Sequence, residues 1–167
     1  MTDIPDSHPR KASLMSRQKM VEASKRGLLA ESAMIAHGRG EAFDYLLGEK
    51  TSDSASLAIR EAAARLLVAE SPVISMNGNS TVLAGSEAIK IASILGCPVE
   101  VNIYYRTSDR MESLIGELES LRDRLGSESL DKAGQSIMDV EILGEVADGR
   151  ILGLQGPRSL CSSRGIE

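Results

Sequence analysis

Apolar residues in the first part of the chain recur every three or four positions, the spacing of amphipathic helices. The spacing predicts four helices, over residues 9–26, 31–36, 41–47 and 51–70. Gly27 and Gly48 directly follow two of them, and glycine is a common residue just past the end of a helix. Pro72 ends the last one, because proline lacks the backbone N–H that a helix uses. Residues 1–70 are therefore predicted to form a helical segment.

After Pro72 the pattern changes to short apolar runs that alternate with helical spacing. The runs predict strands over residues 73–76, 99–104 and 140–143. Helices are predicted between them, one ending near Leu95 and one running from Thr107 to Gly126, followed by a polar loop over residues 127–136. This alternation predicts an α/β fold with a Rossmann-like, mostly parallel, doubly wound sheet in three layers. The chain is interpreted as one domain, in which the helical segment packs on a core formed by residues 71–167.

The composition narrows the class of function. The chain has 167 residues, of which 42% are hydrophobic and 26% charged, as in a globular domain. Its net charge is −5, and it has one Phe, three Tyr and no Trp, so it lacks the basic surface and stacking aromatics of nucleic-acid-binding proteins. The two cysteines, Cys97 and Cys161, lack metal-ligand spacing and are interpreted as reduced thiols. No apolar run approaches the roughly 18 residues that cross a bilayer, and no signal segment is recognised, so a cytoplasmic location without membrane contact is expected.

The segment from His37 to Glu41 is the first candidate for chemistry. Glycines on both sides of Arg39, at positions 38 and 40, allow a ligand to approach the guanidinium and the backbone N–H groups. A helix that begins at Glu41 would direct its positive end to the same place, which favours an anion. The predicted pocket therefore includes His37, Gly38 and Gly40. The alternative is a glycine-rich turn with a solvated arginine, in which His37 has a capping or hydrogen-bonding role.

Arg17 is a second candidate, because it falls on the apolar face of the first predicted helix between Leu14 and Val21. A permanently charged side chain in that position either extends to water or meets an anion.

A third candidate follows the first predicted strand, at Asn77, Gly78 and Asn79. Backbone N–H groups at the start of a helix bind phosphate, and the two amides can orient a polar substrate. Asn102 and Arg106 lie near the end of the next strand and are expected to face the same crevice, where Arg106 would bind a phosphate. The alternatives are a structural turn and a salt bridge from Arg106 to Asp109. Neither histidine has the neighbours of a catalytic triad or a metal site, so no catalytic residue and no metal ligand is assigned.

These candidates fall in longer blocks that resemble one family. The blocks are Ile4–Arg10, Ser13–Leu14, Arg17, Ile35–Glu49, Pro72–Asn79 and Val99–Arg106. They resemble archaeal phosphopantothenate synthetase, also called 4-phosphopantoate–β-alanine ligase, up to about Leu143. The resemblance implies an ATP-dependent ligase of coenzyme A biosynthesis that joins 4-phosphopantoate to β-alanine through an acyl-adenylate, giving 4'-phosphopantothenate, AMP and pyrophosphate. It also implies Mg²⁺, a homodimer, and contacts from Arg17 and Arg39 to ATP.

The sequence departs from the family at its C-terminal end. Family members continue through a further strand and a loop that also contacts ATP, so the family domain is expected to be incomplete in this chain. Two hypotheses follow. The chain is either a ligase, or a catalytically incompetent homologue that acts at most as an α/β module binding a phosphate metabolite.

Overall fold

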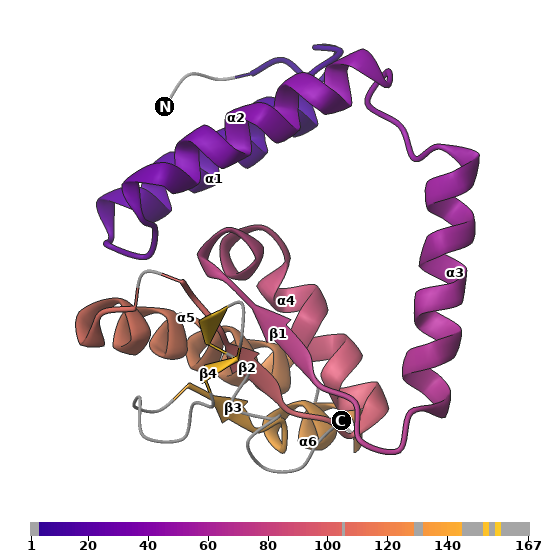
Figure 1. Ribbon diagram of the computed structural model, residues 1–167, viewed down its shortest axis with the longest axis vertical. Coiled ribbons are helices and arrows are strands. Elements are labelled where there is room, and N and C mark those ends of the chain that lie inside the picture. The colour runs from indigo at the N-terminus through magenta and orange to yellow at the C-terminus, as the bar shows by residue number, and fades with distance from the viewer. Residues whose placement is uncertain (1–3, 105, 129–131, 145–151, 154–155, 158–167) are drawn as a thin grey trace.

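The computed structural model describes residues 4–104, 106–128, 132–144, 152–153 and 156–157 (Figure 1). Its N-terminal part is helical, as predicted. Helices α1 (Lys11–Lys25) and α2 (Glu31–Leu46) pack side by side. They are joined through Gly27, whose φ of +76° suits glycine. Helix α3 (Asp53–Val68) stands apart from them and buries no residue.

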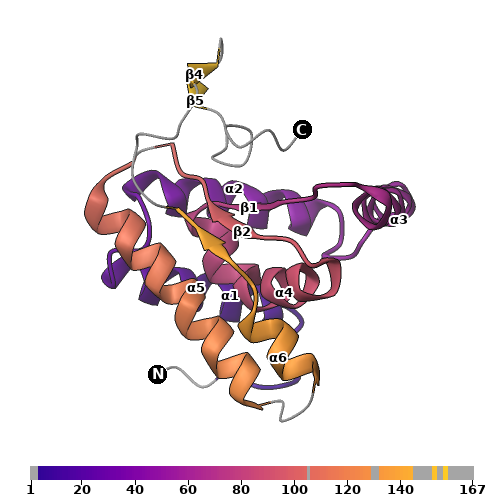
Figure 2. The same cartoon turned by 90° about the horizontal axis from the view of Figure 1, so that it is seen from below.

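A parallel three-stranded sheet forms the centre of the rest of the chain. Its strands are β1 (Ile74–Met76), β2 (Val99–Val101) and β3 (Ile142–Leu143), in that spatial order. The connections contain α4 (Gly78–Leu95), α5 (Ser108–Glu128) and α6 (Lys132–Met138). A short antiparallel pair, β4 (Leu152–Gly153) and β5 (Gly156–Pro157), lies apart from this sheet (Figure 2). The α/β class and the parallel sheet are confirmed.

The consecutive strand order places both connections on one face of the sheet, because such crossovers are almost always right-handed. Accordingly, α4, α5 and α6 pack against one another on the same side (Figure 2). Among the described residues, no crossover helix forms a second layer on the opposite face. The predicted third layer is therefore not supplied by these connections.

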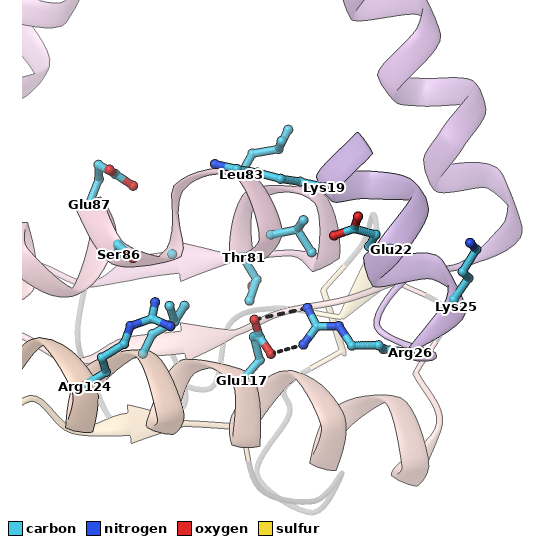
Figure 3. A pocket seen from close by; sticks show the side chains of 13 residues that line it. Lys19, Glu22, Lys25, Arg26, Thr81, Leu83, Ser86, Glu87, Glu117 and Arg124 are labelled. Atoms are coloured by element: carbon cyan, nitrogen blue, oxygen red, sulfur yellow. Dashed lines mark hydrogen bonds and ion pairs between the residues drawn. The ribbon is translucent and has the colours of Figure 1, made fainter. Parts of the chain in front are cut away.

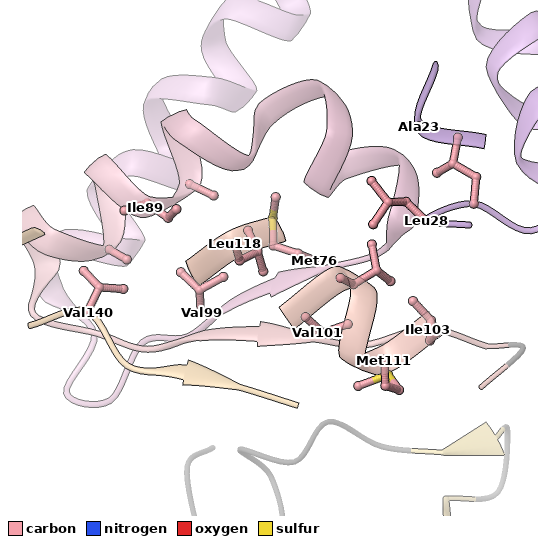
Figure 4. Packing of buried hydrophobic residues seen from close by; sticks show 14 of the residues in the cluster. Ala23, Leu28, Met76, Ile89, Val99, Val101, Ile103, Met111, Leu118 and Val140 are labelled. Atoms are coloured by element: carbon pink, nitrogen blue, oxygen red, sulfur yellow. The ribbon is translucent and has the colours of Figure 1, made fainter. Parts of the chain in front are cut away.

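The core lies between the sheet and these helices. Val99 and Val101 of β2 meet Ile89 of α4 and Leu118 of α5 in this layer, and the end of α1 closes it with Ala23 (Figure 4). All five side chains are at most 1% exposed. Because α1 contributes to the same cluster as the strands, the first helix and the α/β core share one hydrophobic centre.

The prediction for residues 126–136 is wrong in part. Helix α5 continues past Gly126 to Glu128, and α6 begins at Lys132 within the expected polar loop. A Cβ atom at Gly126 would lie 2.5 Å from Met138 Sδ, so the glycine allows α6 to pack closely against α5. In the sequence, a glycine that allows two helices to pack closely looks the same as a glycine that ends a helix. The end of α5 was therefore predicted too early.

Candidate functional site

The first candidate site lies at the carboxyl ends of β1 and β2, where ligands of open α/β sheets collect. A cavity of about 480 Å³ is lined there by the first turns of α2, the β1–α4 junction, the residues after β2, and Arg110 of α5. We call it the amide cleft, because Asn77, Asn79 and Asn102 line it. The sequence prediction placed all three of these residues, with Gly78, in such a crevice.

The β1–α4 junction is held rigidly by local hydrogen bonds. The Asn77 side chain accepts from the Ser80 N–H at 3.0 Å, and Ser80 Oγ accepts from the Asn77 N–H at 2.8 Å, which forms a capping box. Asn79 Nδ2 donates to the Ala33 carbonyl at 3.1 Å and so ties α4 to α2. A Cβ atom at Gly78 would lie only 3.1 Å from the Leu28 carbonyl oxygen. The junction therefore holds one wall of the amide cleft in a fixed position.

Arg106 makes a different contact from the predicted one. Its guanidinium donates from Nη2 to the Gly144 carbonyl at 2.8 Å, which links the chain after β2 to the end of β3. The arginine that lines the amide cleft is Arg110 instead.

The second candidate site is a groove between α1 and α2, with a volume of about 550 Å³. Arg17 lines this α1–α2 groove together with Leu14, Tyr45 and Glu41. Arg17 Nη1 lies 2.7 Å from Glu41 Oε2, and Ser13 Oγ donates to the same carboxylate at 3.3 Å. An incoming anion would have to compete with Glu41 for this guanidinium.

The Glu41 carboxylate is held in its charged form. Burial pushes its pKa upward, but the hydrogen bond from Arg17 and the electrostatic effects of His37 and Arg17 outweigh burial and leave the pKa below its ordinary value. His37 Nε2 lies 3.9 Å from Glu41 Oε2 and has no hydrogen-bond partner among the described residues.

The predicted turn at residues 37–41 is wrong, because α2 runs without a break from Glu31 to Leu46. Gly38 and Gly40 are both helical, and neither has positive φ. Each glycine costs a helix about 1 kcal/mol relative to alanine, but a break would leave up to four carbonyl groups unpaired at one new end and up to four N–H groups unpaired at the other. One continuous helix avoids that loss, so the helix start expected at Glu41 to bind an anion does not exist.

The continuous helix also separates Arg39 from Arg17. Each helical residue turns the chain by about 100°, so Arg39 leaves α2 about 200° from Glu41, the residue that faces Arg17. Arg39 is exposed on the same side of α2 as Ile35 and Phe43, which lie four residues before and after it. The two arginines therefore point to nearly opposite sides of α2.

Replacing Gly38 by alanine is expected to raise the free energy of unfolding by about 0.5–1 kcal/mol, because alanine is the better helix former. A Cβ atom there would meet nothing within 4 Å, so the packing in this chain does not require glycine. Urea denaturation measures the change. Gly48→Ala is the matched control, and it should destabilise the chain because φ at Gly48 is +79°. Loss of stability in the Gly38→Ala variant would argue that residues 37–41 are not helical in solution.

A third cavity, of about 550 Å³, lies on the helical side of the molecule between α1, α4 and α5 (Figure 3). It is lined by charges of both signs, and Arg26 binds Glu117 in a bidentate manner at 2.7 and 3.3 Å. It lies away from the carboxyl ends of the strands, so it is not a candidate for the main site.

A family model described as phosphopantothenate/pantothenate synthetase matches residues 54–167. The chain belongs to this family. A 4-phosphopantoate–β-alanine ligase from Thermococcus onnurineus is 41% identical over 166 residues, which cover 99% of this chain and 58% of that protein. The ligase of the same name from Methanosarcina mazei is 42% identical, with 99% and 59% covered. The chain thus spans about 58% of the length of the relatives it matches.

Within this synthetase family fold, the described residues contain no group of three or more His, Cys, Asp or Glu side chains placed to hold a metal ion. No helix in the described part of the chain has both the length and the apolar character needed to span a membrane. Cys97 is a buried free thiol, and burial raises its pKa, so it is unreactive; Cys161 falls outside the described residues.

Three residues that the structure brings forward were not identified as site residues from the sequence: Arg110, Glu41 and Glu100. Arg110 lies three residues after Thr107, whose hydroxyl accepts its N–H at 3.4 Å. A basic residue in the first turn of a helix is unusual, and this was the available signal. Glu41 was predicted only as the start of a helix. Glu100 is fully buried in β2, but an acid within an apolar strand is identified as buried only when both faces of the sheet are known.

Proposed function

We propose that this chain catalyses the ATP-dependent condensation of 4-phosphopantoate with β-alanine, a step of coenzyme A biosynthesis. The observation that carries the proposal is the family match over residues 54–167, with relatives named 4-phosphopantoate–β-alanine ligase. The geometry supports it, since an anion-compatible cleft lies at the carboxyl ends of β1 and β2 and a second cavity contains Arg17.

The reaction is proposed to occur in two steps. A carboxylate oxygen of 4-phosphopantoate attacks the α-phosphorus of ATP, and pyrophosphate leaves. The amine of β-alanine then attacks the acyl carbon, forms the amide, and releases AMP. Negative charge accumulates on the phosphates in the first step, so fixed guanidinium groups and a rigid cleft are the expected contributions of the protein.

We assign the ATP phosphates to Arg17 and Arg39. Arg17 lies in the α1–α2 groove, where exchange of Glu41 for a phosphate would keep the guanidinium paired. Arg39 is on the other side of α2, so within one chain it cannot meet phosphates bound at Arg17, and its proposed contact with ATP requires a second copy of the chain. Mg²⁺ is proposed to arrive with ATP, because it is commonly held by substrate phosphates and one or two carboxylates.

The second substrate region is assigned to the amide cleft. Asn77, Gly78 and Asn79 form its wall, and Arg106 fixes the neighbouring chain through its bond to Gly144. His37, Gly38 and Gly40 remain candidates for a ligand that approaches α2 along its glycine positions, which carry no side chains. No catalytic acid or base is assigned.

The test is AMP formation by the purified chain with ATP, Mg²⁺, 4-phosphopantoate and β-alanine. Omitting β-alanine should prevent amide formation while leaving pyrophosphate release coupled to 4-phosphopantoate. Absence of AMP, together with absence of ATP binding by calorimetry, would reject the ligase. Thermal stabilisation by 4-phosphopantoate without AMP would instead support the non-catalytic binding module.

We also propose that the chain works as a cytoplasmic homodimer, with residues 1–70 and 71–167 as parts of one domain. Large apolar side chains are exposed on α2 and α3, among them Phe43 at 63%, Leu46 at 80%, Leu67 at 68% and Val68 at 80%. Patches of this kind often mark protein interfaces. Arg39 lies among them on α2, so a second copy covering this surface would also enclose that arginine.

The variant Leu67→Glu is expected to weaken self-association, because a charge on an exposed apolar helix opposes burial. Since α3 buries no residue, the fold of each chain should be unaffected. Light scattering after gel filtration gives the mass as a function of concentration. Arg65→Glu, on the charged side of α3, is the control and should leave association unchanged. Equal dimer fractions in wild type and Leu67→Glu would remove α3 from the interface.

A further inference from the structure

The amide cleft has one charged side chain among the described residues that line it, and that side chain is Arg110. No described acidic residue lines the cleft. A ligand with an ammonium group would therefore lack a partner there, whereas an anionic group would meet a guanidinium. Arginine is well suited to a phosphate, because its planar fork donates two parallel hydrogen bonds.

The guanidinium of Arg110 is placed at the rigid wall of the cleft. Its Nη2 atom lies 3.7 Å from the position that a Cβ atom at Gly78 would occupy. Gly78 therefore allows the Arg110 guanidinium to lie close to the wall that Asn77 and Asn79 also line. The guanidinium and the amides thus converge on one side of the cavity.

A second wall of the cleft is apolar. Ala30 is the N-cap of α2, Ala33 and Ala36 lie in its first turns, and Ile103 lies after β2. Small side chains along one wall leave room for a branched aliphatic group. 4-Phosphopantoate combines the matching features, since a phosphate ester at one end is separated from the carboxylate by a carbon that carries two methyl groups.

We propose that Arg110 binds the phosphate of 4-phosphopantoate in the amide cleft, with the dimethyl group against the alanine wall. This inference rests on the proposed function and adds to it a residue that distinguishes the phosphorylated substrate from free pantoate. The substrate carboxylate then lies toward the open side of the cleft, where ATP has to meet it. Arg106, bonded to Gly144, has a positioning role.

The test compares calorimetric affinities for 4-phosphopantoate and pantoate in the wild-type chain and in Arg110→Gln. Wild type should bind the phosphorylated compound about 10- to 100-fold more tightly, the range of a hydrogen bond to a charged group. Arg110→Gln should abolish this preference and leave pantoate affinity within about twofold, since pantoate lacks the phosphate. Arg124→Gln, an exposed arginine of the same helix outside the amide cleft, is the matched control and should retain the preference.

The outcomes separate this inference from the proposed function. If wild type prefers 4-phosphopantoate and Arg110→Gln keeps that preference, the Arg110 subsite is wrong and the ligase proposal stands. If wild type binds neither compound, both are rejected. Arginine labelling of the wild type with phenylglyoxal gives a second measurement that does not require the variant to fold. 4-Phosphopantoate should protect Arg110 more than pantoate does at equal occupancy, and equal labelling would overturn the assignment.

Discussion

Replacing Arg17 by glutamine is expected to reduce the rate of AMP formation by about 100- to 1,000-fold, the usual effect of removing one donor that stabilises transition-state charge. Its guanidinium is the one proposed to meet the ATP phosphates in the α1–α2 groove. The measurement is the steady-state rate at saturating 4-phosphopantoate and β-alanine, with ATP varied. A loss of rate with unchanged 4-phosphopantoate binding would place the effect at the nucleotide.

The matched control is Arg26→Gln. Arg26 lies on the exposed C-terminal end of α1 and forms an ion pair with Glu117 at 2.7 Å, the same length as the Arg17–Glu41 pair. Both pairs are solvent-accessible on the arginine side, so each contributes at most about 1 kcal/mol to stability. If Arg17 only fixes α1 to α2, then Arg17→Gln and Glu41→Gln should lower stability alike and leave AMP formation near the wild-type rate. That result would contradict the nucleotide assignment.

The glycines show which helix ends could be predicted from the local sequence and which could not. Gly27 and Gly48 were predicted to end helices, and both have positive φ at those places. Gly38, Gly40 and Gly126 gave the same signal, but all three lie inside helices. The difference lies in contacts from distant parts of the chain. Ser13 and Arg17 hold Glu41 from a neighbouring helix, and Met138 packs onto Gly126 from the next one.

Part of the candidate site was predictable, because ligands of open parallel sheets bind at the carboxyl ends of the strands. A polar junction after a parallel strand lies at the ligand edge of the sheet, so the sequence predicted the crevice at Asn77 to Asn79. The choice between Arg106 and Arg110 was not predictable, because both follow β2 within a few residues. Only the positions of Gly144 and Gly78 show that one arginine binds a carbonyl and the other lines the cleft.

Replacing Glu100 by alanine is expected to lower the free energy of unfolding by about 3 kcal/mol, from the lost hydrogen bonds of a buried side chain and the cavity that alanine leaves. Glu100 is fully buried in the central strand. Its Oε1 accepts from Ser75 Oγ at 2.7 Å and from Asn102 Nδ2 at 3.4 Å. Alanine would remove this acceptor from both donors and open a cavity beside them.

The variant Glu100→Gln separates the effect of the lost hydrogen bonds on stability from the effect of the lost side-chain volume. Glutamine keeps the size and one carbonyl acceptor for Ser75, so it should cost about 1 kcal/mol, close to the value of one hydrogen bond. Glu119→Ala, at an exposed acid of α5, is the control and should change stability by less than about 0.5 kcal/mol. Urea denaturation of the four proteins gives the comparison. Because Asn102 lines the amide cleft, Glu100→Ala should also weaken 4-phosphopantoate binding. If the variant is instead as stable as wild type, the buried carboxyl group supports neither the sheet nor the cleft.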